Sequence, residues 1–187
     1  MNKACIAKLG WKLKIRESSL WCETTRGKHK GHGELDNGPQ AINYDSTMLK
    51  TTIILWPHLE QMSFWEVGNG NNTRVWKDCW VQLGLKLQDH MIQPNEISYF
   101  YTVASLRTKD GEWNWNMFKN LFHQDLLDKI LAIPPRSQNT NEDDTCIWVG
   151  TSNGNFTMSS MFENINIGSN EENMDDWKGI WRLDVLE

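Results

Sequence analysis

Tryptophan is the residue type that most constrains how this chain can fold. The sequence holds 11 Trp in 187 residues, more than its 6 Phe and 3 Tyr together. Each indole carries roughly 150–250 Å² of mostly apolar surface, and burying most of them would contribute on the order of 50 kcal/mol before conformational entropy is subtracted. We therefore expect a tryptophan-rich core. The alternative is that several indoles stay exposed as stacking platforms for nucleic-acid bases or sugars.

Charge is divided unevenly along the chain. The net charge of −5 excludes a polycation of the kind that coats nucleic acid. Residues 1–32 nevertheless carry eight Lys or Arg and two acidic residues, a net +6, whereas residues 33–187 carry a net −11. Only the N-terminal arm can therefore hold phosphate by charge.

No segment has the pattern of a membrane span or a secretory signal. Unbroken apolar runs, such as residues 53–56, are far shorter than the roughly 20 residues that cross a bilayer. Residues 1–8 are charged where a secretory signal would need an apolar stretch. We therefore expect an intracellular chain, nuclear or cytoplasmic and not secreted, with no membrane partner. Its widely spaced cysteines should be reduced and buried as small hydrophobes; they are Cys5, Cys22, Cys79 and Cys146.

Apolar residues recur at helical spacing in the first third of the chain. Residues 3–13 predict a basic amphipathic helix. A second, short helix is expected around residues 18–23, where either Ser18 or Ser19 could cap it. Residues 48–62 predict a third helix, which Pro57 should end or kink because proline lacks the N–H that helical hydrogen bonding needs.

Helical spacing returns in residues 111–130, where one apolar stripe is stopped by the prolines at 134–135. A break near His123 would divide this region into two helices instead of one. Ser160 and Glu163 have the spacing of a capping box, in which each side chain accepts a backbone N–H of the other, and they predict a further helix start.

Two β-hairpins are expected where β-rich runs flank turn residues. The runs are residues 64–67 with 73–76 around 68–72, and residues 146–149 with 156–158 around 152–154. The Asn-Gly pair at 153–154 is the strongest short turn signal in the chain. Residues 76–80, which place two indoles four apart, fit either a bending strand or one helical turn.

Together these signals predict an α+β chain, mainly helical with two β-hairpins, a Trp-rich core and flexible linkers. The expected segments are a basic helical arm (1–32), a linker (33–47), a helix plus Trp-rich hairpin (48–82), a variable segment and helical block (83–135), an acidic loop (136–145), a hairpin and capped helix (146–165), and an acidic linker with the truncated start of a further module (166–187).

Acidic clusters are the first candidates for metal chemistry. A polymerase site needs adjacent aspartates after an aromatic residue, so that they can hold two metal ions. The only run of three acids is Glu142, Asp143 and Asp144, and Asn141 stands where the aromatic residue should be. We favour a solvated charged loop there. The same interpretation applies to Glu171 with Glu172 and to Asp175 with Asp176.

Other catalytic signatures are weaker still. His29 and His32, with Cys22 and Cys5 before them, do not have the close paired spacing of a zinc finger. The sequence contains no Gly-x-Ser-x-Gly elbow and no phosphate loop ending in Gly-Lys-Ser/Thr. We therefore expect no catalytic residue, no metal and no cofactor in this chain, and a solvated basic loop around His29.

The basic arm with its interleaved indoles is the best candidate for contact with nucleic acid. Ammonium groups release counterions from phosphates, and indoles stack on bases. An ordinary amphipathic helix explains the same pattern. The candidate residues are Lys3, Lys8, Trp11, Lys12, Lys14, Arg16, Trp21, Arg26, Lys28 and Lys30.

Several runs resemble the polyproteins of plant non-LTR (LINE-type) retrotransposons, in the region between the reverse transcriptase and the zinc-binding and RNase H modules. The first is residues 2–13 with Ser19, Leu20 and Trp21, similar to the segment just past the polymerase. Residues 64–70 with 74–80 are similar to the family's Trp-x-Val-Gly-x-Gly and Phe-Trp-x-Asp-x-Trp signatures. Residues 111–115 through 130–134 are similar to its next block. Residues 148–158 with Ser160 and Phe162 are similar to the lead-in to its zinc-binding module, and residues 177–183 are similar to the first helix of that module, which would be truncated here.

The resemblance implies a non-catalytic fragment or relic of a polyprotein that copies RNA into DNA. The family's polymerase and RNase H carboxylates and its zinc ligands fall outside this stretch, so none is carried over. In the parent protein this region would act as a spacer and positioning segment, with the neighbouring modules as partners and possible nucleic-acid contact through the basic arm. The alternative is a stand-alone binding module that uses exposed Trp to stack on single-stranded nucleic acid or glycans.

Overall fold

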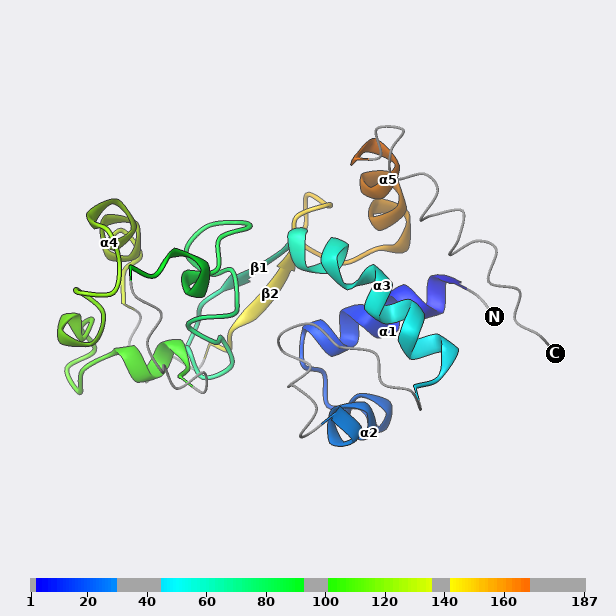
Figure 1. Ribbon diagram of the computed structural model, residues 1–187, viewed down its shortest axis with the longest axis horizontal. Coiled ribbons are helices and arrows are strands. Elements are labelled where there is room, and N and C mark those ends of the chain that lie inside the picture. Colours follow the sequence, from blue (N-terminus) through cyan, green and yellow to red (C-terminus); the bar gives the residue numbers. More distant parts are fainter. Residues whose placement is uncertain (1–2, 30–44, 93–100, 136–141, 169–187) are drawn as a thin grey trace. The chain divides into compact units, whose positions relative to one another are not determined.

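The chain forms two compact units, which are described separately below (Figure 1). The computed structural model describes residues 3–29, 45–92, 101–135 and 142–168. Unit 1 comprises residues 1–62 and 148–187, and unit 2 comprises residues 63–147. Within the described residues there are five α-helices and one two-stranded antiparallel sheet. The predicted mixed α+β class, mainly helical, is confirmed.

Unit 1 is built from helices. They are α1 (Lys3–Lys14), α2 (Leu20–His29), α3 (Thr47–Gln61) and α5 (Met158–Gly168). Helix α1 packs against α3 and α5. A Cβ at Gly10 would lie 2.8 Å from Leu59 Cδ1, so glycine permits the close approach of α1 to α3. The helices predicted at 3–13 and 18–23 are confirmed, and the second runs on to His29.

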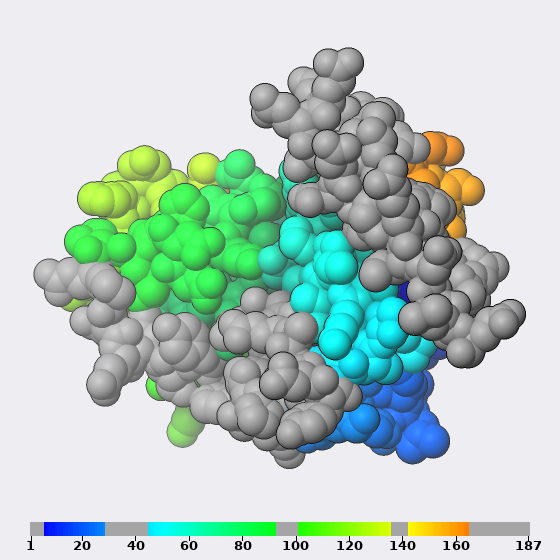
Figure 2. Space-filling view, turned by 45° about the vertical axis from the view of Figure 1, so that its right-hand side comes forward, coloured from blue at the N-terminus to red at the C-terminus, as the bar shows by residue number. Residues whose placement is uncertain are grey.

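Helix α3 does not end at Pro57, the residue that was expected to end or kink it. The Ser46 side chain accepts a hydrogen bond from Leu49 N at the start of the helix, and the helix runs on past Pro57 to Gln61. Pro57 is exposed. The surface of α3 is cyan in Figure 2. A proline in a helix interior costs about 3 kcal/mol, and burial of Trp56 and Leu59 on either side of it offsets that cost.

Three aromatic rings pack together in unit 1. The Trp11 ring stacks on Phe156 with centroids 5.1 Å apart, and it meets Trp148 edge-on at 5.6 Å. The fully buried Trp148 donates a hydrogen bond from Nε1 to Ser160 Oγ at 2.8 Å. The predicted capping box at Ser160 is therefore wrong: α5 begins at Met158, and Thr157 Oγ1 accepts the Ser160 N–H.

The strands of unit 2 pair differently from the prediction. Strand β1 (Ser63–Glu66) pairs with β2 (Thr145–Trp148), which is the first strand of the other predicted hairpin. The prediction of both hairpins is therefore wrong. Residues 73–76 do not run back along β1, because the Asp78 carboxylate accepts the Arg74 N–H at 2.7 Å and closes a turn there.

The segment expected as the second strand of each hairpin forms no strand of the sheet. Arg74 forms an isolated antiparallel bridge with Thr102, and the turn over residues 75–77 settles the choice left open for residues 76–80 in favour of a turn. After β2, Trp148 N donates to Gly154 O at 2.8 Å, so the Asn-Gly pair does mark a turn. No strand follows it in the described residues, because α5 begins four residues later at Met158.

Unit 2 encloses an aromatic core. The ring centroids of Trp80 and Trp113 lie 5.9 Å apart. The indole N–H of Trp80 donates to Val75 O, and that of Trp113 donates to Ile133 O. The core residues are Trp65, Val75, Trp76, Trp80, Leu87, Val103, Leu106, Trp113, Phe118, Phe122, Leu126, Leu127 and Ile130. Short 3₁₀ helices at Leu87–His90 and Val103–Leu106 supply Leu87, Val103 and Leu106, and a third one at Trp115–Met117 packs against the core.

The helical block of residues 111–130 is divided as the sequence allowed. Helix α4 (Gln124–Leu131) begins only after His123, so the break near His123 is confirmed. The helix expected before the break is wrong, because residues 115–117 form only a short 3₁₀ helix there. The apolar stripe faces inward on both sides of the break, with Phe118, Phe122 and Ile130 all buried. One hydrophobic stripe therefore spans two elements.

The expected tryptophan core is confirmed. Of the nine tryptophans that the structure describes, seven are buried, and Trp21 and Trp115 are partly exposed. Cys22 and Cys79 are buried free thiols, as expected, and Cys146 is half-buried. None of the described helices has the length and apolar character of a membrane span. The predicted linker up to residue 44, Trp177, Trp181 and most of the last predicted segment lie outside the described residues.

A glycine substitution tests the close packing of unit 2. Gly70 has φ +77°, and a Cβ there would lie 2.7 Å from Ala104 N. We therefore expect Gly70→Ala to lower the unfolding free energy by at least about 1–3 kcal/mol. Gly84→Ala is the matched control, because Gly84 has φ +74° and nothing within 4 Å. Urea unfolding followed by tryptophan fluorescence measures both. Equal costs for the two variants would contradict the close approach of residues 70 and 104.

Candidate functional site

The predicted nucleic-acid residues other than Lys30 lie on α1, α2 and the connection between them. Lys8 and Lys28 are exposed, and Trp21 is partly exposed. The side chains of Lys3 and Lys30 lie outside the described residues. The remaining five candidates make contacts within unit 1, which divide them into two groups.

One group ties the α1–α2 connection together. Lys12 Nζ lies 2.6 Å from Glu17 Oε1, and this hydrogen bond raises the pKa of the lysine above its ordinary value. Arg26 donates from Nη2 to the Glu17 carbonyl oxygen at 3.0 Å, and Arg16 adopts the left-handed backbone conformation with φ 58°. Glu17 therefore organises cations from both helices.

The other group is buried. Lys14 is only 8% exposed, and its ammonium lies 3.5 Å from a Glu60 carboxylate oxygen and 5.6 Å from the centroid of the Trp56 ring. Trp11 belongs to the aromatic cluster described above. A buried ammonium needs such partners because desolvation is costly. Trp11 and Lys14 therefore hold α1 in place, and neither offers an open surface to a nucleic acid.

Helical spacing was the signal that could have separated these residues. Ala7, Trp11 and Lys14 are spaced by four and three residues, so they lie on one face of α1. Ala7 is fully buried, and that face is the inner one. Lys8 lies outside this series and is exposed. The basic arm thus combines a structural inner face with a small cationic outer one.

A second site, which the sequence did not predict, closes around Asp144. We call Asp144 together with residues 68–73 the carboxylate clasp. Asp144 Oδ1 accepts the N–H groups of Gly68 and Gly70, both at 2.7 Å. Its Oδ2 accepts those of Asn72 and Thr73, both at 2.8 Å. Each carboxylate oxygen therefore receives two short, charge-assisted hydrogen bonds.

The remaining backbone N–H groups of the clasp are also hydrogen-bonded. Asn69 N donates to the Glu142 carbonyl oxygen at 2.8 Å, and Asn69 Nδ2 donates to Asp143 Oδ1 at 3.0 Å. Asn71 N donates to Asn69 Oδ1 at 3.0 Å, so each backbone N–H from residue 68 to residue 73 has an acceptor. A Cβ at Gly68 would collide with the Glu142 carbonyl oxygen, so only glycine fits there.

The clasp corrects one part of the sequence interpretation. Glu142 and Asp143 are exposed, as expected of a solvated loop, but Asp144 is half-buried and holds residues 68–73. The described residues contain no group of three His, Cys, Asp or Glu side chains able to hold a metal ion. No local pattern could have identified the clasp, because its donors precede Asp144 by 71–76 residues. Cys5, His29 and His32 have no described side chain, and neither has the acidic segment 171–176.

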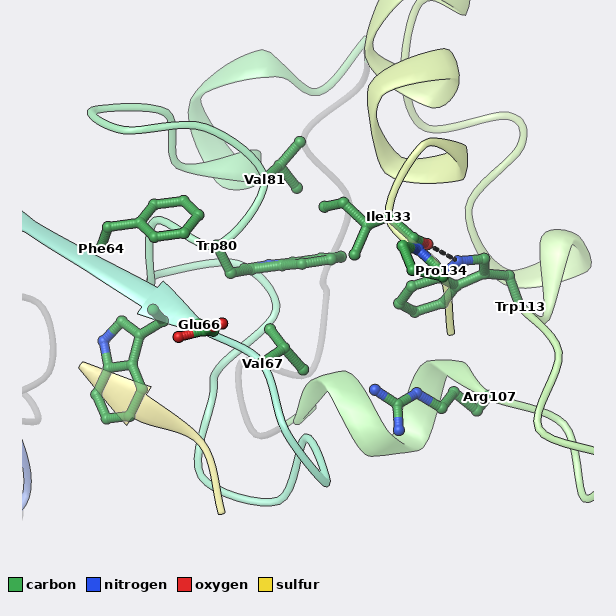
Figure 3. A pocket seen from close by; sticks show the side chains of 10 residues that line it. Phe64, Glu66, Val67, Trp80, Val81, Arg107, Trp113, Ile133 and Pro134 are labelled. Atoms are coloured by element: carbon green, nitrogen blue, oxygen red, sulfur yellow. Dashed lines mark hydrogen bonds between the residues drawn. The ribbon is translucent and has the colours of Figure 1, made fainter. Parts of the chain in front are cut away.

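Unit 2 also contains an aromatic cavity of about 190 Å³ (Figure 3). The indoles of Trp80 and Trp113 and the side chains of Arg107 and Glu66 line it. The buried Arg107 guanidinium lies 5.7 Å from the centroid of the Trp113 ring, and its Nη1 donates to Asn69 O at 3.4 Å. The indole N–H groups of Trp80 and Trp113 donate inside the protein, so these two residues offer only ring surface to the cavity.

Comparison with known proteins gives no match of any kind. No protein-family model matches the chain, and neither a curated protein nor a solved structure matches it.

Substitution of the clasp carboxylate tests its structural role. Asp144→Asn replaces one accepting oxygen by an NH₂ group that faces backbone donors, and we expect it to cost about 2–4 kcal/mol of unfolding free energy. The matched control is Asp143→Asn, which alters a neighbouring exposed carboxylate and should stay within about 0.5 kcal/mol. Chemical denaturation with tryptophan fluorescence measures both. A control as destabilised as Asp144→Asn would show that general charge, and not the clasp, explains the loss.

Proposed function

We propose that this chain is a non-catalytic segment of a plant non-LTR retrotransposon polyprotein, a spacer that positions the reverse transcriptase relative to the zinc-binding and RNase H modules. The sequence resemblance is the origin of the proposal. The observation that carries it is structural: the residues of the family-like signatures are used to build and close unit 2. A site that bound or converted a substrate would instead present such residues toward an open surface.

The first signature illustrates this use. Trp65 is buried in the core of unit 2. Gly68 and Gly70 lie where a side chain would collide with the backbone of residues 142 and 104, and both donate their N–H groups to Asp144. The Trp-x-Val-Gly-x-Gly pattern thus specifies a strand that runs from the core into the clasp.

The second signature follows the same logic. Trp76 and Trp80 are buried, and Trp80 donates its indole N–H to Val75 O at 3.0 Å. Asp78 is also buried, and its carboxylate accepts the N–H of Arg74. An aspartate between two indoles could suggest a catalytic acid, yet this one closes a backbone turn. Its role supports an architectural segment.

The burial of the indoles weighs against a module that stacks bases or sugars on exposed tryptophan. Stacking needs an open ring face, and seven of the nine described indoles are buried. Trp21 and Trp115 are the two described indoles that keep part of their surface exposed. Contact with nucleic acid is therefore better assigned to charge, through Lys8 and Lys28 on unit 1.

A primer-extension assay tests the non-catalytic assignment. We expect the purified chain, given a primed RNA or DNA template, nucleotides and Mg²⁺ or Mn²⁺, to extend no primer, because the Asp144 oxygens are engaged with four backbone N–H groups. A retroviral-type polymerase serves as the positive control. Template-dependent synthesis that chelation of the metal abolishes, and that Asp143→Asn or Asp144→Asn removes, would overturn the proposal.

Nucleic-acid contact is tested by the salt dependence of binding. The variant that carries both Lys8→Gln and Lys28→Gln should bind a labelled single-stranded oligonucleotide more weakly than the native chain, as measured by fluorescence anisotropy. The slope of log K against log salt should fall by roughly 1.4, since each phosphate contact on a single strand contributes about 0.7. Lys119→Gln, an exposed lysine of unit 2, is the control and should leave the slope unchanged. If Lys119→Gln lowered the slope as much as Lys8→Gln with Lys28→Gln, a role for the basic helices would be contradicted.

A further inference from the structure

We propose that residues 68–73 form an oxyanion-binding nest for carboxylates, and that Asp144 is its built-in ligand. Once the Asp144 side chain is removed, a free carboxylate ion can occupy the same four N–H donors. This inference concerns a binding site within unit 2 and does not depend on the proposed function.

The donors converge as a carboxylate requires. The N–H groups of Gly68 and Gly70 meet one oxygen at 2.7 Å, and those of Asn72 and Thr73 meet the other at 2.8 Å. Successive backbone N–H groups that point into one concavity are a recurring anion-binding device, in which alternation of right-handed and left-handed backbone turns the donors inward. Gly70, with φ +77°, supplies the left-handed step.

The nest has supports that do not involve Asp144. Its carbonyl groups point away from the carboxylate, toward residues 103–107. Ala104 N donates to Gly70 O and Val103 N donates to Thr73 O, both at 2.9 Å. Arg107 Nη1 donates to Asn69 O at 3.4 Å. Because the carbonyl side is held independently, the donors keep their arrangement when the carboxylate is absent.

The nest also lies in a favourable electrostatic setting. Arg107 is 7% exposed, and its guanidinium contacts the carbonyl side of the loop through Asn69. A buried guanidinium adds positive potential to that of the backbone N–H groups. The bound carboxylate is only half-buried, so solvent reaches the site and a small ion can enter it.

A tether explains why the native chain keeps its own ligand. Asp144 is held beside the nest by strand β2, which begins at Thr145, and by the Asn69–Glu142 backbone hydrogen bond. A tethered group has an effective concentration in the millimolar range or above, so a free ion competes poorly with it. Removing the side chain removes the competitor and leaves a space shaped for one carboxylate.

Chemical rescue of Asp144→Ala tests the proposal. Thermal unfolding of the full chain is measured in sodium formate and in sodium chloride at matched ionic strength. We expect formate to raise the Tm of Asp144→Ala by several degrees and to saturate, as binding to the folded state alone requires. The native chain and Asp143→Ala are the controls, and neither should respond to formate more than to chloride. The same response in all three chains, or no response of Asp144→Ala, would overturn the proposal.

A second variant keeps the test decisive if Asp144→Ala does not fold in either salt. Asp144→Ser removes the carboxylate and retains a small polar side chain. In ¹H–¹⁵N spectra, formate should shift the amide signals of the four nest donors and leave the Gly84 and Gly111 signals in place. The nest donors are Gly68, Gly70, Asn72 and Thr73. Shifts spread evenly over the glycines, or none at the donors, would contradict the nest.

Discussion

The carboxylate of Asp144 is the contact on which the rest of unit 2 depends. Its two oxygens collect four backbone N–H groups from residues 68–73. Gly68, Gly70 and Thr73 are buried, and a buried donor left without an acceptor costs roughly 1–3 kcal/mol. The Asp144 side chain therefore contributes strongly to the stability of this loop. The same contact brings the end of β1 to the start of β2, and it accounts for the pairing of two strands that are far apart in the sequence.

Tryptophan burial works together with this polar contact. The indoles of unit 2 fill the core with ring surface, and Trp80 and Trp113 also donate hydrogen bonds to carbonyl groups of loops that no regular ladder would satisfy. A unit with one two-stranded sheet and short helices has few regular hydrogen bonds. Large amphipathic side chains suit such a fold, because they add apolar area and their polar ends can hold loops in place. In unit 1 the indole of Trp148 donates to the Ser160 hydroxyl on α5.

The sequence predicted the elements whose signals are local, and it failed where partners are distant. Periodicity located α1 and α3, a serine cap located α2, and the break near His123 placed the start of α4. The hairpins failed because β propensity locates a strand without naming its partner, and the partner of β1 lies about 80 residues away in β2. For the candidate site, composition identified the basic helices but could not place Trp11 and Lys14 on their inner face. The clasp joins residues 71–76 positions apart and leaves no local trace.

Native-state hydrogen exchange measures the central claim most directly, because it reports the opening of individual hydrogen bonds. If Asp144 closes unit 2, the amide protons of Gly70 and Thr73 should exchange only when the core opens, with the same opening free energy as the indole N–H of Trp80. Amide protons of Gly70 and Thr73 that exchange at the rate of an unstructured loop, while the Trp80 proton stays protected, would contradict the account.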